Sequence, residues 1–172
     1  MGFFSNIFAR GEPALSDAGP RDARDIAALH SKSFQRGWSE DEVEGLLTER
    51  NVIAHRALAG KKLAGFILSR LAADEAEILS VAVDAGFQGR GLARRLLNLH
   101  LGRLAGYGVR TVFLEVGETN DPAAKLYARA GFREVSRRPN YYPGPSGAPI
   151  TALVLRRDLV GGPVDTARPG SI

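Results

Sequence analysis

One stretch, SVAVDAGFQGRGLARRLL at residues 80–97, constrains the fold of this 172-residue chain more than any other. It begins with apolar, partly β-branched residues, continues through two glycines, and enters a leucine-rich helical pattern at about Leu92. We therefore predict a buried strand, a tight glycine loop and the start of a helix in immediate succession. The other elements of the chain have to pack around this unit.

The glycine loop is suited to bind an anion. Gly89 and Gly91 have no Cβ atoms to keep a ligand from the backbone, and the first helical turn has N–H groups without helical partners. The helix dipole and the side chains of Arg90, Arg94 and Arg95 add positive charge, so we predict a pyrophosphate site. A Walker loop is excluded because no Gly-Lys-Ser/Thr sequence follows Gly91. A dinucleotide-binding fingerprint is excluded because Arg94 stands where that motif needs a third glycine or alanine. A tight turn with a solvated basic face remains the structural alternative.

The length of 172 residues predicts a single domain, and apolar periodicity and turn signals predict the helices and strands within it. Two short helices come first, and a capping box of Ser39 and Glu42 opens the second. An antiparallel meander of three strands follows, and its third strand leads into the glycine loop. Beyond the long helix we predict the strand TVFLEV, the short helix DPAAKLYARAG, and the strands FREVS and ITALVLRRDL.

Three segments are predicted to lie outside this regular structure. The loop RRPNYYPGPSGAP, residues 137–149, is rich in proline and glycine, and we expect no regular element there. Residues 1–11 are expected to be a flexible leader or a short docking helix, and residues 160–172 a disordered tail.

Composition narrows the function classes. The chain has no cysteine, which excludes disulfides and thiolate chemistry and fits a cytoplasmic location. Its three histidines show no i, i+4 pair, and no apolar run is long enough for a membrane helix, so we expect neither a metal site nor a membrane partner. The net charge of +4 is dispersed in short pairs, which favours a phosphate-bearing small molecule over nucleic acid.

A glutamate interrupts the apolar strand TVFLEV, and a tyrosine follows it on the next helix. Burial penalises a charged carboxylate, so Glu115 is either a poised base or the ion-pair partner of an arginine such as Arg110 or Arg133. Tyr127 is either a core residue or a proton donor. Asn120 directly precedes the helix and is expected to cap it or to form a turn.

The hexapeptide QGRGLA at residues 88–93 matches the Q/R-x-x-G-x-G/A acetyl-CoA motif, and the chain resembles the GNAT superfamily of N-acetyltransferases over roughly residues 12–159. The resemblance implies an α+β fold with a central, mostly antiparallel, twisted sheet of six to seven strands flanked by about four helices. It also implies that acetyl-CoA is the cofactor, that coenzyme A is the product, and that the acetyl group passes directly to an amine.

A longer pattern, LEVGETNDPAAKLYARAGF followed by RRPNYYP, resembles the RimI-type branch of that family, the ribosomal-protein-alanine N-acetyltransferases. This resemblance implies that Glu115 is the proton acceptor and Tyr127 the proton donor. The segment WSEDEVEGLL resembles the substrate-side helices of the branch and implies a substrate contact for Trp38. The residues that the resemblance assigns to the cofactor are Val81, Ala82, Val83, Gln88, Gly89, Arg90, Gly91, Leu92, Ala93, Arg94, Asn120 and Tyr127.

The acceptor remains open at this stage. Tyr141 and Tyr142 are expected either to form one wall of a slot for an extended peptide end or to pack against the sheet. Gly117, Gly37 and residues 149–151 depart from the pattern of the branch, and these positions lie on the acceptor side. Three hypotheses follow: acetylation of the N-terminal α-amine of a protein such as a ribosomal protein, acetylation of a small amine (amino acid, polyamine or aminoglycoside), or acyl-CoA binding without catalysis.

Overall fold

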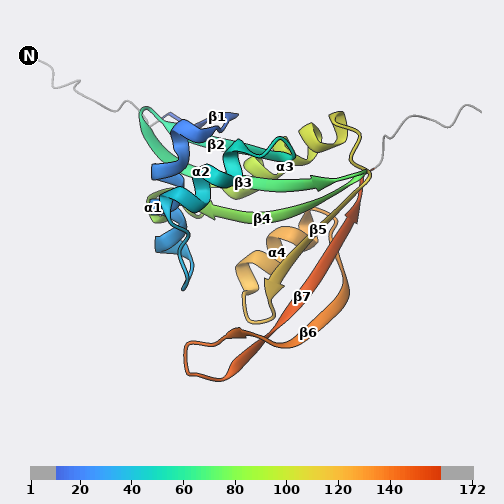
Figure 1. Ribbon diagram of the computed structural model, residues 1–172. Helices are drawn as coiled ribbons and strands as arrows, with labels where there is room; N and C mark the ends of the chain where they lie inside the picture. The colour runs from blue at the N-terminus through green and yellow to red at the C-terminus, as the bar shows by residue number, and fades with distance from the viewer. Residues whose placement is uncertain (1–10, 160–172) are drawn as a thin grey trace, which may run out of the picture. The chain divides into compact units, whose positions relative to one another are not determined.

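The structure is a computed structural model that describes residues 11–159. Within these residues the chain forms seven strands and four α-helices, together with two short 3₁₀ turns at Pro20–Asp22 and Ala85–Phe87 (Figure 1). The elements are β1 (Ala14–Asp17), α1 (Ala23–Ser33), α2 (Glu40–Thr48), β2 (Val52–Ala59), β3 (Lys62–Ala72), β4 (Glu75–Val83), α3 (Leu92–Gly106), β5 (Thr111–Gly117), α4 (Asp121–Arg129), β6 (Arg133–Pro143) and β7 (Pro149–Asp158).

The described residues divide into two units. Unit 1 runs up to Arg70 and includes Ile78–His100, and unit 2 consists of Leu71–Glu77 and the residues from Leu101 onward. Strands β1, β2, β3 and β4 follow one another in unit 1, and the order in unit 2 is β5-β7-β6. The predicted leader and tail lie outside the described residues, apart from Gly11, and the prediction of one domain stays a prediction.

Strand β1 was missed by the sequence analysis. It has only four residues, too few to show a period, and it is defined by antiparallel pairing with β2, in which Ala14 lies opposite Leu58 and Asp17 opposite His55. The predicted strands β2 and β3 are confirmed as an antiparallel pair. Strand β1 therefore exists because of its tertiary pairing rather than because of its own pattern.

The expectation of no regular structure over residues 137–149 holds for residues 144–148, which form a turn, but is wrong for residues 137–143 and Pro149. Strand β6 continues to Pro143 and pairs antiparallel with β7, which begins at Pro149. β6 is the last strand in the order β5-β7-β6, so the missing N–H groups of its prolines can face the unpaired side. The pairing with β7 shifts between Arg138 and Tyr142, where Asn140 has a φ of 56°. The extra residues of β6 form a bulge at this point, and regular pairing resumes beyond it.

Both faces of β3 are buried in unit 1, which explains its almost unbroken apolar sequence. Phe66 and Leu68 belong to a core formed with residues of α1 and α2, the two helices that lie beside β3 in Figure 1. Gly65 faces the other side, where an added Cβ atom would come within 3.0 Å of Leu96 Cδ1 on α3. The core under α1 and α2 consists of Ala23, Ile26, Ala27, Leu29, Val43, Ala54, Leu63, Phe66, Leu68 and Ala82.

Local hydrogen bonds define the helix ends. The predicted capping box is confirmed, since Ser39 Oγ accepts from the N–H of Glu42 at 3.1 Å and Glu42 Oε2 accepts from the N–H of Ser39 at 2.8 Å. In unit 2, α4 ends before Gly131, which has a φ of 84°. The guanidinium of Arg157 on β7 donates to the carbonyl of Ala130 at 2.6 Å and so satisfies an exposed helix end.

In unit 2, β7 pairs with β5 on one side and β6 on the other, both antiparallel. Along β5 the side chains of Val112, Leu114 and Val116 are buried, whereas the alternate residues are only half-buried. Glu115 is one of these half-buried residues. No helix among the described residues is long and apolar enough to cross a membrane.

A chain of buried polar side chains crosses unit 1, and sequence spacing gave no sign of it. His100 is fully buried, with Nδ1 2.7 Å from His55 Nδ1 and Nε2 2.6 Å from Ser69 Oγ. His55 Nε2 lies 3.4 Å from Asp17 Oδ1. One tautomer set satisfies all contacts: Ser69 O–H donates to His100, His100 Nδ1–H to His55, and His55 Nε2–H to Asp17. Burial, together with the charge of His55, lowers the pKa of His100 to about 3.

We expect the free energy of unfolding to decrease as the pH falls below about 6.5, because His100 is buried in its neutral form. Between the ordinary pKa of 6.5 and the folded value of about 3, the unfolded chain binds a proton that the folded chain does not. The free energy of unfolding therefore falls as the pH falls, by roughly 2 kcal/mol at about pH 5 from this group alone. Urea unfolding from about pH 7.5 to 5 measures the slope, and His100→Gln should flatten it. An equal slope in that variant would contradict the assignment.

Candidate active site

The loop between β4 and α3 has the geometry that the glycines predict. Gly89 and Gly91 have φ angles of 75° and 76°, in the left-handed region that favours glycine. Within residues 11–159, a Cβ atom built at either position meets no atom within 4 Å beyond the adjacent residues of the chain. Backbone conformation rather than crowding therefore requires glycine here, and the space beside the loop is open to a ligand.

Neighbouring groups hold the loop in place. The N–H of Asp84 donates to the carbonyl of Ala64 at 2.9 Å, and Asp84 Oδ1 accepts from the N–H of Gly86 at 3.0 Å. This hydrogen bond, with the ammonium of Lys62 3.5 Å away, keeps the pKa of Asp84 below its ordinary value. The amide of Gln88 donates to the carbonyl of Val83 at 3.0 Å. Gln88 thus ties the loop back to the end of β4.

The start of α3 has exposed positive charge and a vacant cap. Helical bonding begins with the N–H of Arg95 donating to the carbonyl of Gly91 at 3.1 Å. Gly91 has no side-chain oxygen to accept from the first turn, so those N–H groups can point to a ligand. Arg90 and Arg94 are exposed beside them. Arg95 was expected to add its charge here, but its guanidinium instead donates to the carbonyl of Pro13 at 3.2 Å and lies 3.7 Å from Glu12 Oε2.

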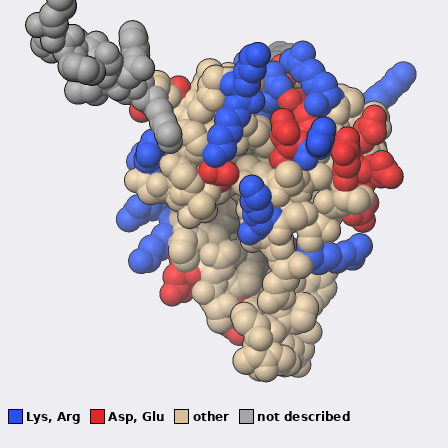
Figure 2. Space-filling model, turned by 90° about the vertical axis from the view of Figure 1, so that its left-hand side faces the viewer, with Lys and Arg blue, Asp and Glu red and all other residues tan. Residues whose placement is uncertain are grey.

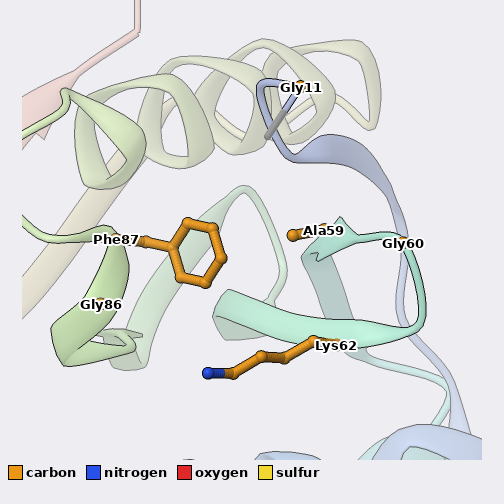
Figure 3. A pocket seen from close by; sticks show the side chains of 6 residues that line it. All are labelled: Gly11, Ala59, Gly60, Lys62, Gly86 and Phe87. Carbon is orange, nitrogen blue, oxygen red and sulfur yellow. The ribbon is translucent and has the colours of Figure 1, made fainter. Parts of the chain in front are cut away.

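A pocket of about 380 Å³ lies beside this loop (Figure 3). Lys62 Nζ and the Arg90 guanidinium each lie 5.7 Å from the centroid of the Phe87 ring, so two cations flank one aromatic side chain. The sequence analysis missed Lys62, because only the strand register places the β2–β3 turn beside the loop. The pocket is lined by Gly11, Ala59, Gly60, Lys62, Gly86 and Phe87.

Glu115 on β5 is paired with an arginine, but not with one that the sequence analysis named. Its Oε1 lies 3.0 Å from Nη1 of Arg138 on β6, and its side chain is 17% exposed. The predicted partner Arg133 instead lies 3.8 Å from Asp158. Arg138 was not considered because the sequence analysis placed it in an irregular loop, whereas the extended β6 brings it beside β7.

Tyr127 on α4 is buried, with 8% of its surface exposed, and meets the ring of Phe132 edge to face at 5.7 Å. Burial raises the pKa of Tyr127 to about 12, so the phenol keeps its proton at neutral pH. Asn120 is confirmed as the cap of α4, since its Oδ1 accepts from the N–H of Ala123 at 3.3 Å. These contacts leave Tyr127 in the protonated form that a proton donor needs.

The three predicted substrate contacts lie in different parts of the chain. Trp38 in unit 1 stacks on His30 at 4.0 Å, and its backbone N–H donates to His30 Nδ1 at 3.1 Å. In unit 2, the rings of Tyr141 and Tyr142 meet edge to face at 5.0 Å, with Tyr141 half exposed. Burial, and next the charge of Glu115, raises the pKa of Tyr142.

The turn between β6 and β7 carries no charged side chain, as the tan lower end of the molecule shows (Figure 2). Of the predicted cofactor residues, Val81–Val83 and Gln88–Arg94 lie at the glycine loop and the end of β4 in unit 1, whereas Asn120 and Tyr127 lie in unit 2. The structure places Glu115 near Arg138 and the two tyrosines in unit 2. Among residues 11–159, no three histidine, aspartate or glutamate side chains come together as metal ligands.

The model of the acetyltransferase (GNAT) family matches residues 23–132. The chain belongs to this family. Three predictions are thereby confirmed: the family resemblance based on the glycine loop, the α+β fold, and the class of enzyme, an N-acetyltransferase.

Individual relatives agree with the predicted branch. A [ribosomal protein bS18]-alanine N-acetyltransferase from Salmonella typhimurium is 39% identical over 110 residues, which are 64% of this chain and 74% of that protein. The protein of the same name from Haemophilus ducreyi is 38% identical over 90 residues, 52% of this chain and 62% of its own length. The chain thus spans somewhat less than two thirds of the second relative.

Solved structures show the same fold. The ribosomal-protein-S18-alanine N-acetyltransferase from Escherichia coli superposes with a TM-score of 0.83 at 26% identity, over 90% of this chain and 98% of that one. Arabidopsis thaliana NAA60 in complex with acetyl-CoA superposes with a TM-score of 0.75 at 20% identity, over 86% of this chain and 99% of that one.

We expect Gly91→Ala to weaken binding of coenzyme A. The left-handed conformation costs an alanine about 1–2 kcal/mol, so the loop either stays strained or changes shape, and affinity should fall about tenfold. Isothermal titration with coenzyme A measures the loss. Gly102→Ala is the matched control, because Gly102 lies within α3 with open space around it, and there alanine should stabilise by roughly 0.5–1 kcal/mol without changing affinity. Equal affinities in the two variants would argue against an anion site at the loop.

Proposed function

We propose that this protein is an acetyl-CoA-dependent N-acetyltransferase that acts on the N-terminal α-amine of a protein, such as a ribosomal protein. The observation that carries the proposal is the mostly buried carboxylate of Glu115, in a chain that also has an open, positively charged glycine loop. The names of the bacterial relatives support the choice of acceptor. A cytoplasmic location stays a prediction.

The glycine loop and β4 supply the cofactor site in this proposal. Backbone N–H groups at Gly89–Arg94 and the guanidinium groups of Arg90 and Arg94 hold the pyrophosphate of acetyl-CoA. Backbone groups of Val81–Val83 bind the pantetheine and acetyl part. The open space beside both glycines fits such a ligand, because no other part of residues 11–159 comes within 4 Å of a Cβ atom built there. Asn120 uses its oxygen to cap α4, so its N–H₂ group is the part that contacts the cofactor.

Glu115 removes the proton that keeps the acceptor amine from attacking. An α-amine with a pKa of about 7.8 is partly neutral at physiological pH, whereas a lysine with a pKa of about 10.4 is almost fully charged. One carboxylate, acting directly or through a water molecule, is therefore enough for an N-terminus. The neutral amine nitrogen then forms its bond to the thioester carbon and the carbon–sulfur bond breaks. Glu115 holds the first amine proton, and the nitrogen loses its second proton to water as it becomes an amide. Glu115 and Tyr127 return to their starting forms by exchange of protons with solvent.

Tyr127 completes the transfer by giving its proton to the departing sulfur. Burial keeps the phenol protonated until a strong base such as a thiolate forms next to it. The chain has no cysteine, so the acetyl group passes to the amine without an acetyl-cysteine intermediate. Orientation of the two substrates contributes more of the rate than either proton transfer, because it can be worth about 7 kcal/mol or more.

The acceptor is proposed to be held by Trp38, Tyr141 and Tyr142. The half-exposed Tyr141 lies on β6, close in sequence to a turn with no charged side chains, and this suits an extended peptide end, since aromatic rings pack on backbone and apolar side chains. The proline and glycine residues of this turn limit its flexibility. Recognition by rings and backbone does not demand one particular side chain from the acceptor.

We expect fast release of coenzyme A only with an acceptor that has a free N-terminus. The measurement compares three acceptors: an Ala-starting peptide, the same peptide with a blocked N-terminus and one lysine, and a small polyamine. The difference in amine pKa favours the first over the second. A preference for the polyamine would assign a small-amine acetyltransferase, and no release with any of them would support acyl-CoA binding without catalysis.

We expect Glu115→Gln and Tyr127→Phe each to lower kcat about 100-fold, because each removes a proton-transfer group. The KM for acetyl-CoA should change little in the Glu115 variant. Circular dichroism and thermal unfolding check that both variants fold. Full turnover by both variants would show that neither residue transfers a proton in catalysis. That result would not affect the proposed cofactor site.

A further inference from the structure

The ion pair between Glu115 and Arg138 is built across β7. Glu115 on β5 is opposite Val154, and Arg138 on β6 is opposite Ala152. Ala152 and Val154 are two residues apart on β7 and share a face of the sheet, so the charged side chains rise on that same face. The fully buried, small side chain of Ala152 lies in the strand that separates them.

The two partners differ in how firmly they are held. The Glu115 side chain is 17% exposed, whereas that of Arg138 is 54% exposed, and the contact joins Nη1 to Oε1 at 3.0 Å. The guanidinium of Arg138 also lies 5.4 Å from the centroid of the half-exposed Tyr141 ring. The carboxylate is therefore fixed in the sheet, and the arginine reaches it from the solvent side. An arginine held in this way can be displaced.

The neighbouring arginine serves a different purpose. Arg137 is opposite Leu153 and so points to the other face of the sheet. Its guanidinium pairs with Glu134 and lies 3.9 Å from Glu118. Tyr142 lies close to Glu115, and four titratable groups act on it electrostatically: Glu115, Tyr141, Arg138 and Glu77. Of these four groups, Arg138 is the cation. Arg138 is the cation that meets Glu115.

We propose that Arg138 occupies the place beside Glu115 that the acceptor's ammonium group takes, and that it thereby sets acceptor affinity. This inference rests on the proposed function, in which Glu115 receives the amine. A guanidinium and an ammonium are both singly charged N–H donors that bind a carboxylate, so they compete for Oε1. Arg138 has to leave this oxygen before the amine can be bound there.

The competition also acts on product release. An acetylated amine carries no charge and does not compete with a guanidinium for a carboxylate. Once transfer is complete and the proton has left Glu115, the pair with Arg138 forms again and the product loses its place. Arg138 in this role determines specificity for charged amines over their acetylated products.

The test is binding of an Ala-starting peptide, with and without N-terminal acetylation, to the full chain in the presence of coenzyme A, by isothermal titration. We expect Arg138→Gln to increase affinity for the free peptide about fivefold, the upper end for a half-exposed ion pair. Arg138→Lys should restore the wild-type affinity. Arg137→Gln is the matched control and should change nothing, and no variant should gain affinity for the acetylated peptide.

The variant Glu115→Gln decides whether the effect acts through the carboxylate. In that background, Arg138→Gln should no longer increase peptide affinity. An equal gain there, unchanged or weaker binding by Arg138→Gln alone, or no peptide binding by either wild type or Arg138→Gln would each overturn the proposal. A wild-type protein that shows the expected binding differences but releases no coenzyme A from acetyl-CoA would refute the proposed function and leave the competition at Glu115 intact.

Discussion

Two-sided burial of β3 is the constraint on which the rest of unit 1 depends. Because successive side chains of a strand point to opposite faces, Phe66 and Leu68 require α1 and α2 on one side, and Gly65 admits α3 closely on the other. With α3 held against β3, the chain leaving β4 has only a short loop in which to reach Leu92. The left-handed glycines make that connection possible, and the same geometry leaves their backbone open to a ligand.

Unit 2 uses its central strand in a comparable way. Strand β7 provides hydrogen bonds to β5 and β6 at once, and so it sets which residues of the two outer strands share a face. Glu115 stands on the less buried face of β5, where a carboxylate can keep its charge because a cation from β6 compensates for lost solvation. The irregular pairing near Asn140 lets a proline-rich segment remain in the sheet while it carries both tyrosines.

The chemistry divides between groups that are fixed and groups that can move. Glu115 and Tyr127, the proposed proton-transfer groups, are mostly buried, whereas Arg138 and Tyr141, which we propose act on acceptor binding, are half exposed. Fixed acid and base groups favour catalysis because their orientation is set before the substrate binds. Exposed groups suit recognition because little energy is needed to rearrange them. The buried histidine chain in unit 1 has no part in this proposed mechanism and couples stability to pH instead.

Elements with local signals could be predicted from the sequence. Glycine spacing, apolar periodicity and the capping box identified the glycine loop, α2, α3 and α4, and one glutamate in an apolar strand marked the candidate base. Which residues of different strands meet could not be predicted in this way, because it depends on how distant segments pair. The short strand β1, the continuation of β6 through residues 137–143, and the contacts of Arg138, Lys62, Arg95 and the His55–His100 pair all depend on strand register. Register is set by hydrogen bonds and packing between segments far apart in the chain, and a local pattern contains no record of either.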